Sequence, residues 1–249
     1  MMAASPTRRR TILMSAVGGV AILVGAVLWS GRGPDLSYVP QMAAYQMTRG
    51  RVLYVQTHEV TISDWNRCND AGRCALRLRP PVGVAGGDYP ATVLNWVDAN
   101  EYLVWINQQS RHDFRLPTVA EWSAIAANVM PDAPDPIFTD PSLTWASSYL
   151  IEGLGNRRLE PTGSYSVTTE GIADLDGNVW EWTQDCYNAD RDIEPLIRCP
   201  AFHVMGEHDA VIPFLVRDPA RGGCAVGSPP AHLGMRLVTD SALPTVKAR

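Results

Sequence analysis

The chain has 249 residues, of which 46% are hydrophobic and 19% are charged, and its formal net charge is -5. These values are typical of an ordinary globular protein, and the length suits one domain with a fair-sized core. Outside the first ten residues, lysine and arginine do not gather into a stripe. The composition therefore excludes the usual electrostatic footprint of a nucleic-acid-binding protein, and we expect no nucleic-acid partner.

The N-terminal region predicts export with a membrane anchor. Three arginines at positions 8–10 precede an uncharged apolar run over residues 11–29, which is about long enough to cross a bilayer core. By the positive-inside rule, residues 1–10 are predicted to be cytoplasmic, residues 11–29 to be a transmembrane signal anchor, and residues 30–50 to be a tether outside a bacterial inner membrane, in the periplasm. Arg9 to Leu13 also resemble a twin-arginine export signal, and since no clean A-x-A site follows, a retained anchor is favoured over a cleaved signal.

The five cysteines suit an oxidising compartment. Cys68 and Cys74 form one close pair and Cys186 and Cys199 a second, and both pairs are predicted to be local disulfides. Neither a C-x-x-C motif nor zinc-type spacing is present. Cys224 stands alone, and a small buried hydrophobic residue is favoured over a reactive thiol at this position.

Four segments carry the clearest local signals. Residues 51–60 are rich in β-branched and aromatic residues and predict a strand. Thr61 and Asp64 predict a helix start, and this helix should end at Gly72. Residues 95–110 predict a helix whose buried stripe contains Trp96, Ala99, Leu103 and Ile106.

A capping box predicts the next helix, because Thr118 and Glu121 directly follow Pro117. Helical spacing then continues through Trp122, Ile125, Ala126 and Val129. From residue 130 to 169 the helical spacing of apolar residues is lost and Pro, Asp, Ser and Gly are frequent, so we expect a loop-rich domain.

The stretch "DLDGNVWEW", residues 174–182, has two interpretations. As a hairpin turn, it would place Gly177 at positive φ and both tryptophans in the core. As a cation site, it would use the carboxylates of Asp174 and Glu181 together with backbone carbonyls, which suits Ca²⁺.

Six landmarks in order resemble the formylglycine-generating enzyme (sulfatase-modifying factor) family: "HEVTISDW", a Cys-x5-Cys pair, "PATVLNWVDANEYLVW", "RLPTVAEW", "GNVWEWTQDC" and "GMRLV". The resemblance implies an α+β fold, the irregular C-type-lectin-like fold with little regular secondary structure. It places the domain at residues 51–240, followed by a C-terminal tail at 241–249. Leu103 stands where many family members have a cysteine.

The resemblance also implies a structural calcium ion at residues 174–182. Its ligands would be the side chains of Asp174 and Glu181 and the backbone carbonyls of Gly177 and Val179. The alternative remains that the turn is a hairpin packed on the core and that the carboxylates pair with arginines. A second family calcium site has no convincing counterpart in this chain.

Active members of the family use two cysteines near the C-terminus, which hold copper(I). The motif "RGGC" at residues 221–224 lies too close to Gly234 to be that segment, since the family leaves roughly thirty residues between the two landmarks. The segment at the expected distance, residues 203–209, lacks the cysteines, and residues 210–216 contain none. Because copper(I) prefers paired thiolates, we predict that this protein does not generate formylglycine.

Other chemistry in this region has a weaker basis. His203, Glu207 and His208 are side chains of the type that holds non-haem iron, but they share one helix face only in part, so polar loop residues are the favoured interpretation. We therefore do not expect copper or iron. Further residues that could line the same cleft are Arg217, Asp218, Arg221, Cys224 and Arg236.

Two classes of function follow from these observations. The first is a membrane-anchored, envelope-facing binding or assembly factor that recognises a periplasmic protein, peptide or glycan. The second is a periplasmic maturation enzyme of oxidoreductase type, like family members implicated in siderophore maturation or associated with copper nitrite reductase. Loss of the cysteine pair favours the first.

Overall fold

The structure is a computed structural model that describes residues 35–84, 86–130, 158–187, 199–219, 230 and 232–243. The predicted anchor at residues 11–29 lies outside these ranges, as do Arg221 and Cys224. Among the helices within these ranges, none is long and apolar enough to cross a membrane.

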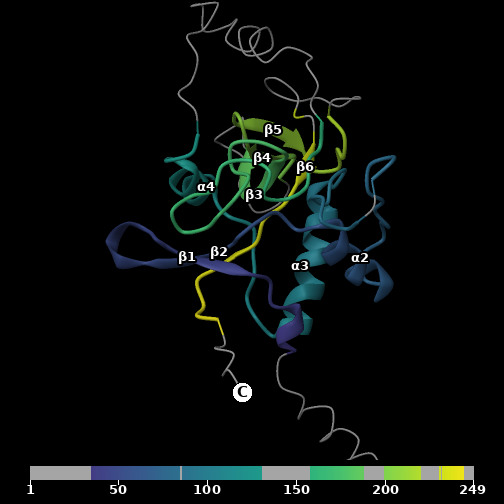
Figure 1. Cartoon of the computed structure of the whole chain (residues 1–249), viewed down its shortest axis with the longest axis horizontal. Coiled ribbons are helices and arrows are strands. Elements are labelled where there is room, and N and C mark those ends of the chain that lie inside the picture. Colours follow the sequence, from purple (N-terminus) through teal and green to yellow (C-terminus); the bar gives the residue numbers. More distant parts are fainter. Residues whose placement is uncertain are drawn as a thin grey trace, which may run out of the picture. The chain divides into compact units, whose positions relative to one another are not determined.

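A small antiparallel sheet is built from three strands in the order β1-β2-β7 (Figure 1). β1 covers Met42–Gln46, β2 Val52–Gln56 and β7 Val238–Thr239, and the register places Ala43 opposite Val55 and Val55 opposite Val238. The sheet thus joins the start of the domain to its last described strand.

The predicted tether is wrong over residues 36–50. This segment forms η1 (Leu36–Tyr38), β1 and η2 (Thr48–Gly50), and η2 closes the turn between β1 and β2. The Tyr45 hydroxyl donates a hydrogen bond of 2.6 Å to the Ala124 carbonyl, and Ala43 is buried. Tertiary contacts therefore order a segment whose sequence shows little periodicity.

The helix predicted after Thr61 is confirmed as α2 (Ile62–Asp70). Thr61 and Asp64 form the capping box, and Gly72 lies just beyond the helix at φ 67°. The predicted disulfide between Cys68 and Cys74 is present and joins the last turn of α2 to the chain that folds back from it.

The second predicted helix is α3 (Trp96–Ser110), capped by Asn95 and Asp98. Ala99, Leu103 and Ile106 are buried as predicted, and Trp96 is partly buried. Tyr102 and Trp105 widen the buried face, because Tyr102 stacks on Trp65 of α2 and Trp105 meets Tyr38 edge to face.

The third predicted helix is α4 (Val119–Ala126), and its capping box between Thr118 and Glu121 is confirmed. Trp122, Ile125 and Ala126 are buried against the β1-β2-β7 sheet and β4. The regular helix stops before Val129, whose N–H bonds the Ala126 carbonyl in a final tight turn.

A second sheet has the order β5-β4-β3-β6 and forms the centre of the fold (Figure 1). β3 covers Trp180–Tyr187, β4 Ala201–Met205, β5 Ala210–Pro213 and β6 Leu233–Gly234. The pairs β3–β4 and β4–β5 are antiparallel, and β3–β6 is parallel. The register shifts between Trp182 and Cys186, which agrees with an irregular sheet.

The core contains most of the tryptophans. Trp182 is fully buried and its indole N–H bonds the Leu94 carbonyl at 2.8 Å, while Trp96 stacks on Phe202 with ring centroids 3.9 Å apart. The fold of the described residues is thus a mixed α/β domain of short elements, as predicted.

Candidate functional site

The turn before β3 differs from the predicted hairpin in one respect. Gly177 is not at positive φ; Asp174 (φ 64°) and Asn178 (φ 71°) are. Asp and Asn tolerate this conformation better than most residues. Gly177 is required for another reason, because a side chain there would meet the ring of Tyr165.

The two aspartates of the turn bind the backbone of the preceding loop. The carboxylate of Asp174 accepts hydrogen bonds from the backbone N–H groups of Gly163 and of Tyr165, the latter at 2.9 Å. Asp176 accepts from the N–H of Ser166 at 3.1 Å and from its hydroxyl at 2.6 Å. The acids of this turn therefore fix residues 163–166.

Glu181 pairs with Arg236, as the arginine alternative predicts. The Arg236 Nη2 donates to Glu181 Oε1 at 2.8 Å and its Nε at 2.9 Å, and both side chains are buried. The Trp122 indole donates to Glu181 Oε2 at 2.9 Å. Arg236 also donates to the carbonyls of Gln56 and Ala173, so this ion pair joins both sheets to the turn.

This bonding pattern does not fit a calcium ion. N–H donors bond both oxygens of Asp174 and of Glu181, and the Gly177 carbonyl accepts the Val179 N–H at 3.0 Å. A cation at this turn would have to share these oxygens with their present hydrogen bonds or displace those bonds. Within the described ranges, no group of three His, Cys, Asp or Glu side chains is placed to hold a metal ion. Calcium at this turn stays a prediction from the resemblance.

Glu59 is a member of this cluster that the sequence did not single out. It is fully buried, and neither carboxylate oxygen has a hydrogen-bond partner in the described part of the chain. Burial raises the pKa of Glu59 well above its ordinary value; Arg236 opposes this shift, and the charges of Glu181 and Asp174 add to it. Three acidic side chains, those of Glu59, Asp174 and Glu181, thus lie near one buried guanidinium, that of Arg236.

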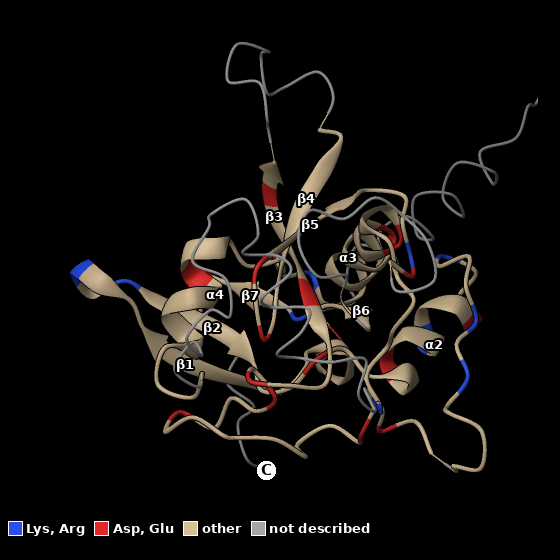
Figure 2. Cartoon of the chain, turned by 90° about the horizontal axis from the view of Figure 1, so that it is seen from above, with Lys and Arg blue, Asp and Glu red and all other residues tan. Residues whose placement is uncertain are grey.

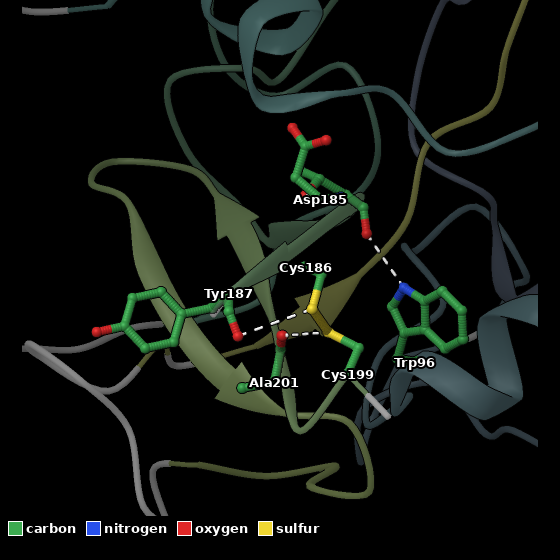
Figure 3. Close-up of a disulfide and its surroundings, with 7 residues drawn as sticks. Trp96, Asp185, Cys186, Tyr187, Cys199 and Ala201 are labelled. Atoms are coloured by element: carbon green, nitrogen blue, oxygen red, sulfur yellow. Dashed lines mark hydrogen bonds between the residues drawn. A yellow bond between two sulfur atoms is a disulfide. The ribbon is translucent and has the colours of Figure 1, made fainter. Parts of the chain in front are cut away.

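The second predicted disulfide is also present, between Cys186 of β3 and Cys199 just before β4 (Figure 3). Trp96 lies beside it, and its indole N–H donates to the Thr183 carbonyl at 3.1 Å. Four of the five cysteines are therefore oxidised, and Cys224 is the one that remains.

The segment that stands where the family would place its cysteine pair is apolar and partly buried in the sheet. Ala210, Val211 and Ile212 form β5 and are buried. The strand pairs with β4 through His203 opposite Val211. This segment supplies no thiol.

Arg221 and Cys224 of the proposed cleft lie outside the described residues, and the described members lie in two places, with Arg217 and Asp218 apart from His203 and His208. His203 pairs with Asp209, Nδ1 to Oδ1 at 3.0 Å, and lies near the Tyr187 ring. His208 packs against Trp180, and its carbonyl accepts the Trp180 indole N–H. Arg217 is in a different place, in the wall of a cavity.

That cavity has a volume of about 450 Å³. Its walls come from the loops that flank α2 and α3, from residues 158–159, and from the segments after β5 and at β6. The lining contains three guanidinium groups, one carboxylate and one imidazole among mainly apolar side chains: Ile62, Arg79, Pro81, Val82, Val84, Tyr89, Thr92, Val93, Arg158, Leu159, Arg217, Asp218, His232 and Leu233.

Arg217 is held rigidly at this wall. Its Nε and Nη2 each donate to Asp98 at 2.7 Å, and Asp98 is buried in the capping box of α3. The chain before Arg217 is fixed to the same helix end, because the Trp96 N–H bonds the Phe214 carbonyl. These hydrogen bonds raise the pKa of Arg217, which stays charged.

Val93 adds a strained backbone to the same wall. A β-branched residue at φ 61° is a true outlier, and Val93 is 46% exposed. Its neighbours hold it there, since the Leu94 carbonyl accepts the Trp182 indole N–H and the Ala91 N–H bonds the Val60 carbonyl. Strain of this kind gathers at functional sites.

Charge on the described surface is dispersed. Figure 2 shows basic segments both at the β1–β2 turn and around α2, with acidic segments interspersed over the domain, α2 included. The cavity is therefore a local concentration of arginines on a domain with no single basic face. The sequence pointed to Arg217 and Asp218 of this lining, but it had no signal for Arg79 or Arg158, which lie in loops. The signal for Asp98, an Asn-x-x-Asp capping box, is a structural one.

The fold and the site define a disulfide-linked mixed α/β domain with a pre-formed arginine-lined cavity. Residues 15–241 match the family described as sulfatase-modifying factor enzyme 1-like domain, and the chain belongs to this family.

Two relatives illustrate the range of the family. The chain is 27% identical over 115 residues to the formylglycine-generating enzyme of Thermomonospora curvata, covering 41% of this chain and 35% of the relative. It is 29% identical over 132 residues to a bovine protein named inactive C-alpha-formylglycine-generating enzyme 2, covering 47% of this chain and 42% of the relative. The matches thus span less than half of each relative.

Among solved structures, PvdO from Pseudomonas aeruginosa is 16% identical with a TM-score of 0.47, over 76% of this chain and 80% of that chain. CarF is 15% identical with a TM-score of 0.47, over 80% and 92%.

Proposed function

We propose that this protein is a membrane-anchored, envelope-facing binding or assembly factor that does not generate formylglycine. The observation that carries the proposal is the state of the cysteines: four of five are in disulfides, and Val211 and Ile212 fill the sheet where a thiol pair is needed. One remaining thiol, Cys224, cannot supply the paired thiolates that hold copper(I).

The proposed binding site is the arginine-lined cavity. Its size falls in the range of pockets that hold small ligands or parts of larger ones, and its mixed apolar and charged walls suit such a role. We infer that a periplasmic protein, peptide or glycan binds there, and that the apolar run at residues 11–29 keeps the domain at the membrane.

Co-expression with a sulfatase tests the catalytic half of the proposal. Mass spectrometry should find the target cysteine of the sulfatase unmodified, while the Thermomonospora curvata enzyme, as positive control, converts it. Fractionation of cells that express the full chain tests the proposed membrane anchoring. The chain should remain with the membranes after a high-salt wash.

The alternative, a maturation enzyme, has one observation in its favour. The His203 imidazole is oriented by Asp209 and its side chain is 24% exposed, an arrangement that suits proton transfer. Elemental analysis of the purified full chain tests this alternative: stoichiometric copper or iron that is lost in the His203→Ala variant would support the enzyme, and its absence from both would favour the binding factor.

A further inference from the structure

The cavity itself indicates what it would bind. We propose that its ligand carries a carboxylate next to an apolar group, as in a short acidic peptide segment. This inference rests on the proposed binding function and names the chemistry of its ligand.

The charges on the walls favour an anion. Arg79, Arg158 and Arg217 line the cavity, against one carboxylate, Asp218. Arg79 has no hydrogen-bond or ion-pair partner in the described part of the chain, and Arg158 forms a long, exposed ion pair with Glu160, Nε to Oε1 at 3.8 Å. Arg79 is therefore available to a ligand, and the exposed pair of Arg158 is of the weak kind that a ligand can replace.

Arg217 contributes from a fixed position. Asp98 takes two of its five N–H donors, which leaves three for a ligand. Because Asp98 is buried and belongs to the cap of α3, the guanidinium loses little freedom when a ligand binds.

The donors favour a carboxylate over a phosphate. Phosphate sites commonly use the free N–H groups at a helix N-terminus, and α2 begins at the cavity with Ile62. Here those N–H groups are taken: Ile62 donates to the Tyr89 carbonyl, Ser63 to the Gly87 carbonyl and Asp64 to the Thr61 hydroxyl. Anion binding therefore depends on planar arginine forks, which match both carboxylate and phosphate oxygens in two-point contact, without the helix N–H groups that many phosphate sites add.

Most of the other side chains that line the cavity are apolar, so the ligand should have an apolar part as well. Val82 and Val93 are exposed at the cavity, and Leu159 and Leu233 line it further. A ligand that covers these side chains while its carboxylate meets the arginines uses both kinds of wall. The strained Val93 backbone, held from behind by Leu94 and Trp182, keeps this wall pre-formed.

The test uses the full chain in mild detergent and a fluorescein-labelled tetrapeptide that alternates Asp and Leu, with an Asn-Leu tetrapeptide as matched probe. Anisotropy should show the Asp-Leu probe binding at least about tenfold more tightly than the Asn-Leu probe, which corresponds to roughly 1.4 kcal/mol. Free hexanoate and inorganic phosphate serve as competitors. Displacement by hexanoate as effective as that by unlabelled peptide would identify a small carboxylic acid as the ligand.

Variants locate the binding. The double variant Arg79→Gln/Arg158→Gln should weaken binding of the Asp-Leu probe by about tenfold. Arg77→Gln should leave it unchanged, since Arg77 is also exposed and only two residues away but pairs with Asp70 outside the cavity.

Three results would overturn the inference: equal affinity for the two probes, stronger displacement by phosphate than by hexanoate, or equal loss in the Arg77 variant. Absence of measurable binding by the Asp-Leu probe would do so as well. Formylglycine in the co-expression assay would instead contradict the proposed function, so the two failures are distinguishable.

Discussion

Glu59 is the residue at which burial and charge conflict most. Both of its carboxylate oxygens are buried without a hydrogen bond in the described part of the chain, beside Glu181, Asp174 and the single cation Arg236. Because its pKa is raised on folding, the folded chain binds a proton more tightly than the unfolded chain, and folding stability falls as the pH rises above the ordinary carboxyl range.

The Glu59→Gln variant should therefore be more stable than the wild type at pH 8 and gain less at pH 5, because the amide carries no charge to desolvate. Thermal melting across this range measures the difference. Glu170→Gln, at an exposed carboxylate, is the control and should follow the wild type. A parallel pH dependence of wild type and Glu59→Gln would show that Glu59 is compensated in some other way.

Glu121 shows the opposite behaviour. Burial alone would raise its pKa, but hydrogen bonds from Arg115, the Thr118 N–H and Arg51 outweigh burial and lower the pKa to about 2. The group thus stabilises the fold above the ordinary carboxyl pKa, and this contribution is lost as the pH falls towards 2.

Substituting Glu121→Gln should cost roughly 2 kcal/mol of unfolding free energy at neutral pH, and the difference from wild type should shrink between pH 5 and pH 2. Chemical denaturation at several pH values measures it. Asp70→Asn, which breaks the exposed pair with Arg77, should cost less than about 1 kcal/mol. If both variants cost the same, the buried network of Glu121 has no special role.

At the scale of elements, the helix starts were predictable because their signals are local. Thr61, Asn95 and Thr118 each cap a helix through a residue three positions on, and all three capping boxes form. That residues 42–46 form strand β1 was not predictable, because Ala43 and Tyr45 are held by contacts with β2 and α4 and the local sequence has no strand-like periodicity. Nor was the cavity, whose arginines lie in loops far apart in sequence.

Asp98 connects a helix start to the cavity, and this predicts energetic coupling. Asp98→Asn should cost more than the ordinary cap loss of about 1 kcal/mol, because Arg217 loses its buried partner as well. In a double-mutant cycle with Arg217→Gln, the two changes should be non-additive by roughly 0.5–3 kcal/mol. If denaturant titrations show that the two losses of unfolding free energy are additive, Arg217 is not held by Asp98. Thr118→Ala is the control, because it removes a helix cap and no ion pair.

The turn that leads into β3, residues 174–182, was predictable only in part. The nine residues were correctly assigned to a turn followed by core tryptophans, but the sequence left open whether the carboxylates bind calcium or arginine. Only the fold brings Arg236 to Glu181, 55 residues away in sequence. Because the carboxylate oxygens already accept hydrogen bonds, excess chelator should leave the melting temperature of the full chain unchanged, and a fall that added calcium reverses would show that the ion displaces these hydrogen bonds.

At the scale of the whole molecule, the sequence predicted the family, the mixed α/β fold and both disulfides, because ordered motifs and cysteine spacing survive divergence. In this chain β5 is apolar and buried, and a cavity with three arginines lies beside the segment that follows it. These observations support our proposal that this family member recognises a ligand and does not oxidise a cysteine.

The co-expression assay tests that claim most directly. The full chain is produced with a sulfatase, and mass spectrometry reads the state of the target cysteine, with the Thermomonospora curvata enzyme in a parallel culture. We expect an unmodified cysteine with this chain and formylglycine with the control. Formylglycine formed by this chain and lost in the Cys224→Ala variant would overturn the proposed function, because it would show that this chain performs the oxidation and that Cys224 is necessary for it.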